Sequence, residues 1–381
     1  MLNNSFIRNF IFHITILVLL FLSFSRGIYE IFFPKSIAYF FTLLFFVIFF
    51  FVLLDKLKPS IEFLLLVILF LLSSIYSFFI SDISNPLFFL YVIFFAFSIL
   101  FFKISSFKLI NNDCLLNFLI IIFLFFHFLQ QFHLISSVGN SWNHFNHSVR
   151  PSSITGSFLH YPIILSFLTI YKFINNNYKF NIFLLVLFFS ILSTWSRMGF
   201  LLIIVFFSIH FFLIYKFKLL KNKYFLISTA VFFLLLFLVP ALNNRFISGF
   251  NFDSVGNSGR IVAWLRSLER IYYSNDLFGN YFGIYTNLSL NFSDIVSNFS
   301  VTESSILSLL LNFGLIGMTL FYILIYIYLS DVRYGKVIFI TLFIGSLFYP
   351  FLDTSSILIT ILLSKILISN NVLNEDIVKI K

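Results

Sequence analysis

Several arginines in this sequence are candidates for binding an anion. Arg150 precedes Pro-Ser-Ser, Arg197 lies in Ser-Thr-Trp-Ser-Arg-Met-Gly, and Arg260 follows Asn-Ser-Gly. A guanidinium group is planar, permanently charged and able to bind two phosphate oxygens at once, whereas lysine offers a single point charge. Because arginine also dominates the basic residues on one side of the predicted membrane domain, as counted below, the sequence predicts that this side binds a phosphate or a pyrophosphate. The alternative is that arginine falls at these few positions by chance.

The segment that contains Arg260 has the pattern of an amphipathic helix. Apolar residues recur at helical spacing after Ser258, and at about 100° per residue the arginines fall on a different arc. Ser258 is a suitable N-cap, which would place Arg260 in the first turn, where exposed amide groups and the helix dipole favour an anion. The alternative is an interfacial helix whose arginines meet anionic lipid headgroups. The apolar positions are Ile261, Leu265, Leu268 and Tyr272, and the further arginines are Arg266 and Arg270.

Glu303 is the acidic residue best placed to act as a general base. It follows Thr302, a suitable N-cap, at the mouth of a long apolar segment. A base must lie within reach of the proton that it accepts. Asp276 and Asp294 precede it in the same polar stretch and are competitors. The alternative for Glu303 is a first-turn acid that stabilises the helix dipole.

Glycine and histidine give weaker signals. Gly279 and Gly283, in Asp-Leu-Phe-Gly-Asn-Tyr-Phe-Gly, permit either a tight turn or the close approach of a ligand to the backbone. His160 lies near the start of the apolar segment that follows Arg150. His144 and His147 form a His-x-x-His pair, but they lie in an asparagine- and serine-rich stretch without a nearby carboxylate. We therefore expect no metal site and no cofactor.

The elements that position these residues are predicted to be membrane-spanning helices. The chain has 381 residues, of which 60% are hydrophobic and only 10% charged, and its mean hydropathy is +1.04. Soluble proteins carry about a quarter charged residues, so a soluble globular fold is excluded. A membrane β-barrel would show alternating apolar and polar residues instead of long apolar runs. The sequence predicts an all-α, polytopic integral membrane protein.

The apolar runs predict about twelve spans in a single membrane domain, residues 1–381. Two stretches between spans are long enough to hold a site, and the longer of them is the functional candidate because loops of that length are usually functional or disordered. These loops are residues 136–157 and 243–302. The expected spans lie near 6–25, 37–54, 61–80, 86–107, 115–135, 157–174, 180–196, 198–215, 224–241, 303–329, 337–351 and 355–369.

Lysine and arginine are unevenly divided between the two sides of the predicted membrane domain. Of the 24 basic residues, 16 fall on the side of the N-terminus and 14 of these are lysine, whereas seven of the eight on the other side are arginine. The richer side is cytoplasmic by the positive-inside rule, so both termini are expected there. Both long loops, with the arginines, are then extracytoplasmic.

Two absences narrow the function. The sequence has no Gly-x-x-x-x-Gly-Lys-Ser/Thr motif, so it does not hydrolyse nucleotides through a P-loop. It also lacks Asp-x-Asp and Glu-x-Glu, which argues against metal-dependent membrane transferases that carry an acidic pair in the first external loop.

Taken in order, the motifs resemble the O-antigen polymerase and O-antigen ligase superfamily of bacterial envelope glycosyltransferases. The order of the four motifs carries the resemblance more than any one of them. They are Arg150 with Gly156, Ser157, Phe158 and Pro162; Ser196-Arg197-x-Gly199; Gly259-Arg260-x-x-x-Trp264 followed by Leu277-Phe278-Gly279-x-x-x-Gly283; and Ser304 to Gly317.

The resemblance implies a GT-C-like fold and a metal-independent, inverting glycosyl transfer outside the bacterial cytoplasmic membrane. Donor and acceptor are expected to be undecaprenyl-pyrophosphate-linked oligosaccharides. By the resemblance, Arg197 and Arg260 would hold the donor pyrophosphate and Arg150 would assist. Glu303 is the expected base because of its position. The other expected substrate-binding residues are His160, Arg266, Arg270, Gly279 and Gly283.

The resemblance also orders the alternatives. Ligases of the superfamily have a histidine just before the span that follows the large loop, where this chain has Glu303. That difference favours a polymerase of O-antigen, capsule or exopolysaccharide repeat units over a ligase with a lipid A-core or protein acceptor. A lipid-linked-oligosaccharide flippase and a cell-wall polymerase of the shape, elongation and division class remain further alternatives. Membrane lipid and a chain-length regulator are the other expected partners, and no nucleic acid is expected.

Overall fold

The computed structural model describes eleven segments of the chain, and the expected spans near 6–25, 37–54 and 224–241 lie outside them. Within the described part, the chain is helical apart from a 3₁₀ turn, η2 (Ser153–Thr155), and two short antiparallel strands, β1 (His144–Phe145) and β2 (Ser148–Val149). The described segments are residues 60–81, 84–104, 112–135, 144–145, 148–155, 157–215, 255–274, 277–284, 286, 302–352 and 354–368.

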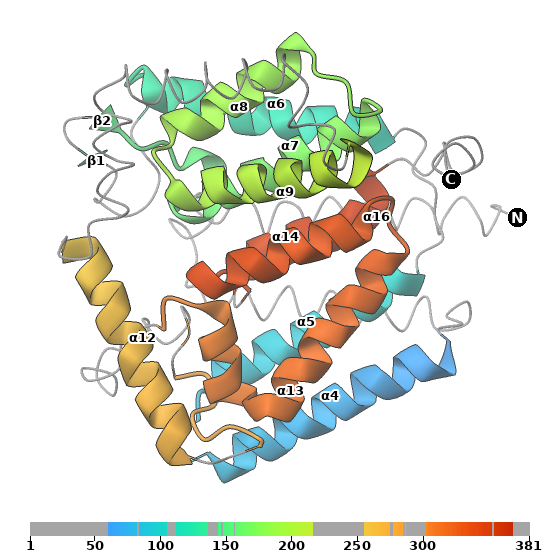
Figure 1. The fold of residues 1–381 in the computed structure, drawn as a ribbon, viewed down its shortest axis with the longest axis vertical. Coiled ribbons are helices and arrows are strands. Elements are labelled where there is room, and N and C mark those ends of the chain that lie inside the picture. The colour runs from blue at the N-terminus through green and yellow to red at the C-terminus, as the bar shows by residue number, and fades with distance from the viewer. Residues whose placement is uncertain are drawn as a thin grey trace, which may run out of the picture.

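Every expected span that falls on described residues coincides with a helix, and the last of them is divided between two short helices (Figure 1). Residues 194–196 form the short connection between α8 and α9. The helices are α4 (Ile61–Ile80), α5 (Pro86–Ile104), α6 (Asn112–Gln131), α7 (His160–Asn175), α8 (Ile182–Ser193), α9 (Arg197–Tyr215), α12 (Val255–Ser274), α13 (Ser305–Ser330), α14 (Gly335–Phe348), α15 (Ser355–Leu362) and α16 (Ser364–Leu367).

Three helices of the described part are long and apolar enough to cross a membrane, namely Ile61–Ile80, Asp113–Gln131 and Ser305–Ser330. A helix of 20 residues spans about 30 Å, the thickness of the hydrocarbon core. In the length and composition of these helices, the chain has the features of a helical membrane protein.

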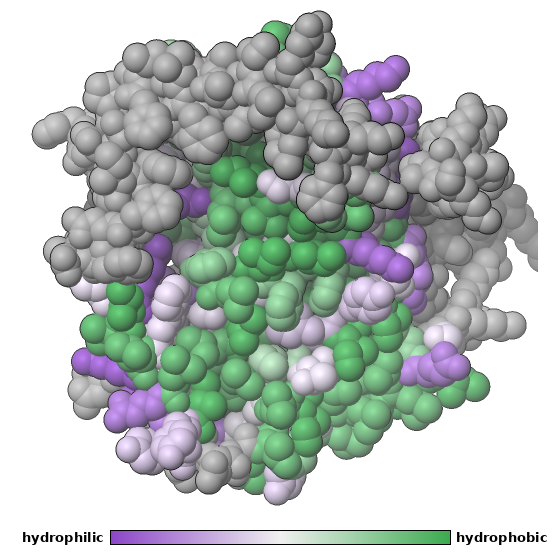
Figure 2. Space-filling model, in the orientation of Figure 1, coloured by the Kyte–Doolittle hydropathy of each residue, from purple (hydrophilic) through white to green (hydrophobic). Residues whose placement is uncertain are grey.

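The surface of α4 shows why water is a poor solvent for this fold. One face of the helix packs Phe63, Val67 and Phe70 into the core, while Leu65 and Leu72 on the opposite face are more than half exposed. Figure 2 shows apolar side chains over much of the same face of the molecule. Soluble proteins rarely expose apolar patches of this extent. Lipid is the environment that such a surface fits.

The core is built around α7, which is buried from His160 to Ile174. It packs against α6, α8, α9 and α15, and Figure 1 shows it between α6 and α9. Its polar side chains are satisfied by neighbouring backbone, because Ser166 donates to the carbonyl of Gly199 at 2.9 Å and Tyr171 donates to that of Thr360 at 3.0 Å. Each bond fixes α7 against a helix that is distant in the sequence.

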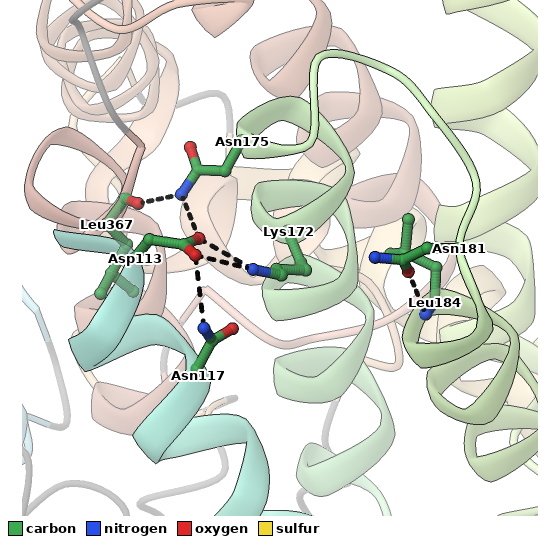
Figure 3. Close-up of polar contacts among 7 residues, drawn as sticks. All are labelled: Asp113, Asn117, Lys172, Asn175, Asn181, Leu184 and Leu367. Carbon is green, nitrogen blue, oxygen red and sulfur yellow. Dashed lines mark hydrogen bonds and ion pairs between the residues drawn. The ribbon is translucent and has the colours of Figure 1, made fainter.

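A buried lysine locks one end of α7 to its neighbours (Figure 3). The Nζ atom of Lys172 lies 2.9 Å from both carboxylate oxygens of Asp113 on α6, and Asn117 donates to the same carboxylate at 3.3 Å. Asn175 donates to the carbonyl of Leu367 on α16 at 2.8 Å. Three helices are therefore tied together at this end of the bundle.

Two further lysines lie near α16 at the same end. The Nζ atom of Lys103 lies 2.7 Å from a carboxylate oxygen of Asp331, and Lys365 on α16 donates to the carbonyl of Lys103. Lys103, Lys172 and Lys365 all belong to the expected cytoplasmic set. The structure thus gathers them at one end of the bundle.

Removing the carboxylate of Asp113 should destabilise the protein more than removing its lysine partner. Asp113→Asn leaves the charge of Lys172, whose side chain is 8% exposed, without its carboxylate. We expect a loss of about 1–3 kcal/mol in the free energy of unfolding, kept moderate because water still reaches Asp113. Lys172→Met removes the charge and keeps the volume, so its cost should be smaller. Equal losses in thermal unfolding of the detergent-solubilised variants would contradict this expectation.

Residues 277–284 fill a break in α13. Gly314 has a positive φ of 66° inside this helix, and beside the break the amide of Ile316 donates to the carbonyl of Leu277 at 3.1 Å. The amide of Gly283 donates to the side chain of Asn312. Gly279 and Gly283 have φ values of 78° and 80°. Both glycines therefore make tight turns against other parts of the protein, the first of the two roles that the sequence allows.

Gly314→Ala should destabilise the protein by about 2 kcal/mol or more. With a ψ of −171°, Gly314 lies in a backbone region that is essentially restricted to glycine, where a side chain costs about 1–3 kcal/mol. A Cβ atom here would also overlap the carbonyl group of Leu277. Gly259→Ala is the matched control, because nothing lies within 4 Å of a Cβ atom at that helical position. Alanine there should be neutral or stabilise the helix by about 0.5–1 kcal/mol. Similar melting temperatures for the two variants would show that the break in α13 is not constrained.

Candidate functional site

Arg150 lies in the turn between β2 and η2 and is largely buried, with 8% of its surface exposed. Its Nε atom donates to the carbonyl of Thr194 at 3.3 Å, and its guanidinium carbon lies 4.4 Å from the ring centroid of Phe158. The turn itself is held by Gln130, whose side-chain oxygen accepts from the amide of Ser153 at 2.7 Å. The loop before α7 thus fixes the arginine against the turn before α9.

Arg197 is the first residue of α9. The side chain of Ser196 caps this helix by accepting from the amide of Gly199 at 3.3 Å. Gly199 allows close packing on α7, since a Cβ atom there would lie 2.9 Å from the Cβ atom of Pro162. The helix dipole and unpaired amides of a first turn favour anions, so α9 adds to the charge of Arg197.

The structure corrects the predicted start of the helix that carries Arg260. This helix, α12, begins at Val255 rather than after Ser258, which lies inside it. Ser258 is therefore not the N-cap, and Arg260 lies in the second turn rather than the first. Arg197, at the start of α9, therefore has the position in a first helical turn that the sequence predicted for Arg260.

The apolar stripe of α12 faces outward. Leu265, Leu268 and Tyr272 are each more than half exposed, whereas Ala263 and Ser267 are buried against the rest of the protein. Figure 1 shows α12 lying across the ends of other helices, as an interfacial helix would. The arginines and the stripe lie on different arcs, as the sequence predicts.

Glu303 lies directly before α13, and its position differs from the predicted one. Ser304 is the N-cap, because its side chain accepts from the amide of Leu307 at 3.5 Å. Thr302 is therefore not the cap and Glu303 is not a first-turn residue, so the helix-dipole explanation of this acid is wrong. Its backbone is left-handed, with a φ of 54°.

Two residues of α12 contact Glu303. The Nε atom of Arg260 lies 3.4 Å from its carboxylate oxygen Oε2, and both side chains are about one third exposed. The indole Nε1 of Trp264 donates to the backbone carbonyl of Glu303 at 3.1 Å. The expected base and an expected pyrophosphate ligand are therefore in direct contact.

Arg150, Arg197 and Arg260 are close enough to act on one another's charge, and they are called the arginine group below. Burial is the main cause that lowers the pKa of Arg150 to about 10; Tyr349 acts in the opposite direction, and the positive charges of Arg197 and Arg260 lower it further. The guanidinium group stays protonated at neutral pH, so its charge persists despite the burial. With the carboxylate of Glu303, the four side chains carry a net charge of about +2. Such a group can bind a multivalent anion and offers a base beside it.

Other predicted site residues lie on α12, at the start of α7, in β1 or outside the described residues. Arg266 is exposed. Arg270 lies about 15 Å farther along the same helix than Arg260, and its guanidinium carbon is 5.9 Å from the ring centroid of Tyr281. His160 begins α7 and is buried. Asp276, Asp294 and His147 lie outside the described residues, and β1 contains His144.

Sequence analysis missed two contributors to the site. Trp264 appears within the large-loop motif, but its contact with Glu303 was not anticipated. Its position one turn after Arg260 was an available signal, because residues four apart share a helix face. Tyr349 follows α14 in an apolar run, where no residue pattern marks it out.

Among the described residues, no group of three histidine, cysteine, aspartate or glutamate side chains could hold a metal ion. No protein family, curated protein or solved structure matches this chain in comparisons of sequence and fold. The arginine group and the motifs of the sequence are therefore the features that point to a function.

Proposed function

We propose that the chain is a bacterial polysaccharide polymerase that joins polyprenyl-pyrophosphate-linked repeat units by metal-independent, inverting glycosyl transfer. The observation that carries the proposal is that Arg150, Arg197 and Arg260, from three separate segments, act on one another's charge, and that Arg260 also contacts the carboxylate of Glu303. Guanidinium groups suit the oxygens of a pyrophosphate, and a carboxylate suits the proton of a sugar hydroxyl. The site thus offers both functions that a glycosyl transfer from a pyrophosphate donor needs.

In the proposed reaction, the acceptor hydroxyl oxygen attacks the anomeric carbon of the donor glycan. A new glycosidic C–O bond forms while the bond from that carbon to the pyrophosphate oxygen breaks, and its electron pair leaves with the polyprenyl pyrophosphate. Glu303 accepts the hydroxyl proton. The fixed positive charges of Arg150, Arg197 and Arg260 stabilise the charge that grows on the leaving group, which is usually the largest catalytic contribution.

The proposal places the arginine group outside the bacterial cytoplasmic membrane and the lysine-rich end of the bundle inside. It includes a GT-C-like arrangement of about twelve spans, with both termini cytoplasmic. Undecaprenyl-pyrophosphate-linked oligosaccharides serve as donor and acceptor, and a chain-length regulator is a further partner. The opposite locations of lysines such as Lys172 and arginines such as Arg150 in the bundle support this orientation.

A ligase that transfers finished glycans to a lipid or protein acceptor would use the same donor chemistry. The residue before α13 favours the polymerase, because ligases of the resembling superfamily carry a histidine where this chain has Glu303. Glutamate directly contacts the arginine group here, which suits a base close to the bond being formed.

Deletion of the gene in its host distinguishes these functions. We expect the deletion strain to show single repeat units, on their carrier lipid or on the usual final acceptor, when glycans are examined by gel and mass spectrometry. Long chains that accumulate on polyprenyl pyrophosphate would identify a ligase instead. Repeat units trapped on the cytoplasmic side would identify a flippase, and unchanged glycans would contradict all three functions.

A further inference from the structure

Helix α12 holds Glu303 at two points. Arg260 contacts its carboxylate at 3.4 Å, and Trp264, one turn later, binds its backbone carbonyl at 3.1 Å. The two contacts differ in kind: the first is an ion pair between partly exposed side chains, and the second holds the main chain. The carboxylate can therefore change partner while the residue itself stays in place.

The ion pair has the properties of a contact that is easily exchanged. It involves the single Nε atom at 3.4 Å, at the long end for an ion pair, and the two side chains are 36% and 34% exposed. Ion pairs of this exposure contribute little to stability. A pyrophosphate brings more negative charge and several oxygens, and it can engage a guanidinium group through two parallel hydrogen bonds.

The other arginines make the exchange favourable. Arg197 and Arg260 both act on the charge of Arg150, so the three positive charges repel one another in the absence of an anion. The single carboxylate of Glu303 offsets this repulsion in part. A pyrophosphate among the three guanidinium groups would offset it more fully than the carboxylate does.

We propose that the Arg260–Glu303 ion pair is a substrate-operated latch: pyrophosphate binding takes over the Arg260 guanidinium and frees the Glu303 carboxylate to accept the proton of the acceptor hydroxyl. This inference rests on the proposed function. The latch adds to the proposed function that the base becomes available only when a donor is bound. Trp264 is then a positioning residue, which keeps the left-handed backbone of Glu303 in place while the carboxylate is released.

Binding of inorganic pyrophosphate to the purified full-length protein tests the latch. Calorimetric titrations in detergent with EDTA present should show Glu303→Gln binding about twofold to fivefold more tightly than the unmodified protein, because the anion no longer displaces a carboxylate. Glu269→Gln is the matched control, since Glu269 is exposed on the same helix and the charge change is identical. That variant should bind with unchanged affinity.

Glu303→Asp separates the latch from simple charge repulsion. Aspartate keeps the negative charge but is one methylene shorter, so its contact with Arg260 should be lost and pyrophosphate should bind more tightly. Repulsion alone predicts unchanged affinity for this variant, a result that would overturn the latch. Aspartate also tolerates a left-handed backbone better than most residues, which favours normal folding. A melting temperature near that of the unmodified protein confirms that folding is intact.

A double-mutant cycle with Arg260→Gln completes the test. The latch acts through Arg260, so the gain in affinity from Glu303→Gln should disappear in the Arg260→Gln background. An equal gain in both backgrounds would overturn the latch and leave the proposed function intact. Absence of pyrophosphate binding by the unmodified protein would contradict the anion site itself, and with it both the latch and the proposed function.

Discussion

Replacing Arg260 by lysine should lower kcat for repeat-unit transfer by about 10²–10³-fold, the usual cost of losing one donor to a developing negative charge. Lysine keeps the positive charge but cannot bind two oxygens in the planar geometry of guanidinium. The loss should appear mainly in kcat, because the leaving group gains charge as the glycosidic bond to it breaks.

Arg333→Lys is the control for this substitution. Arg333 lies at the lysine-rich end of the bundle, where it donates to the side chain of Asn177 at 3.2 Å. It is the same change of residue type far from the proposed chemistry, so we expect normal transfer rates in membranes that contain equal amounts of each variant. Full activity of Arg260→Lys would show that charge alone is sufficient and would remove the bidentate contact from the mechanism.

Glu303→Gln should lower kcat by about 10²–10⁴-fold, the range in which a positioned general base contributes. Glutamine keeps the size of the side chain and its hydrogen-bonding oxygen, but it cannot accept the acceptor proton. Donor binding should be retained, because the arginines that bind the pyrophosphate are unchanged. Glu269→Gln, on the exposed side of α12, should leave the rate as it is. A Glu303→Gln variant that is as active as the unmodified protein would assign the proton to another group.

Different features of the sequence point to Arg260 and to Glu303, the residues changed by these two substitutions. Arg260 stands out because arginine dominates the predicted external loops. Glu303 stands out because it precedes a long apolar segment. Their direct contact follows from neither pattern, since 43 positions separate them in the sequence and only the packing of α12 against α13 joins them.

The helices of the membrane domain were predictable because apolar runs of span length have few alternatives in a chain of this hydropathy. Helix starts were less predictable. Thr302 and Ser304 are both suitable caps before α13, and tertiary contacts select the second, because Ser304 donates to the carbonyl of Ser346 at 3.2 Å. The same difficulty affected α12, where both Ser254 and Ser258 are of a capping type and the helix begins at Val255.

The residues of the arginine group could be predicted from the sequence, but the contacts that bring them together could not. Motif residues that looked independent prove to contact one another: Gly199 packs on Pro162, and Phe158 lies against the guanidinium group of Arg150. These contacts bring the turn before α9 to the loop before α7. Tyr349 joins the group only through the fold.

Polymerisation by the purified protein is the most direct test of the proposed function. The full-length chain should be reconstituted in liposomes with undecaprenyl-pyrophosphate-linked repeat units from its host, with EDTA present. We expect a ladder of glycans at whole multiples of the repeat unit, together with released undecaprenyl pyrophosphate, and no ladder with Arg260→Lys. Repeat units that remain single in the presence of the folded, unmodified protein would contradict the assignment of polymerase activity to the arginine group.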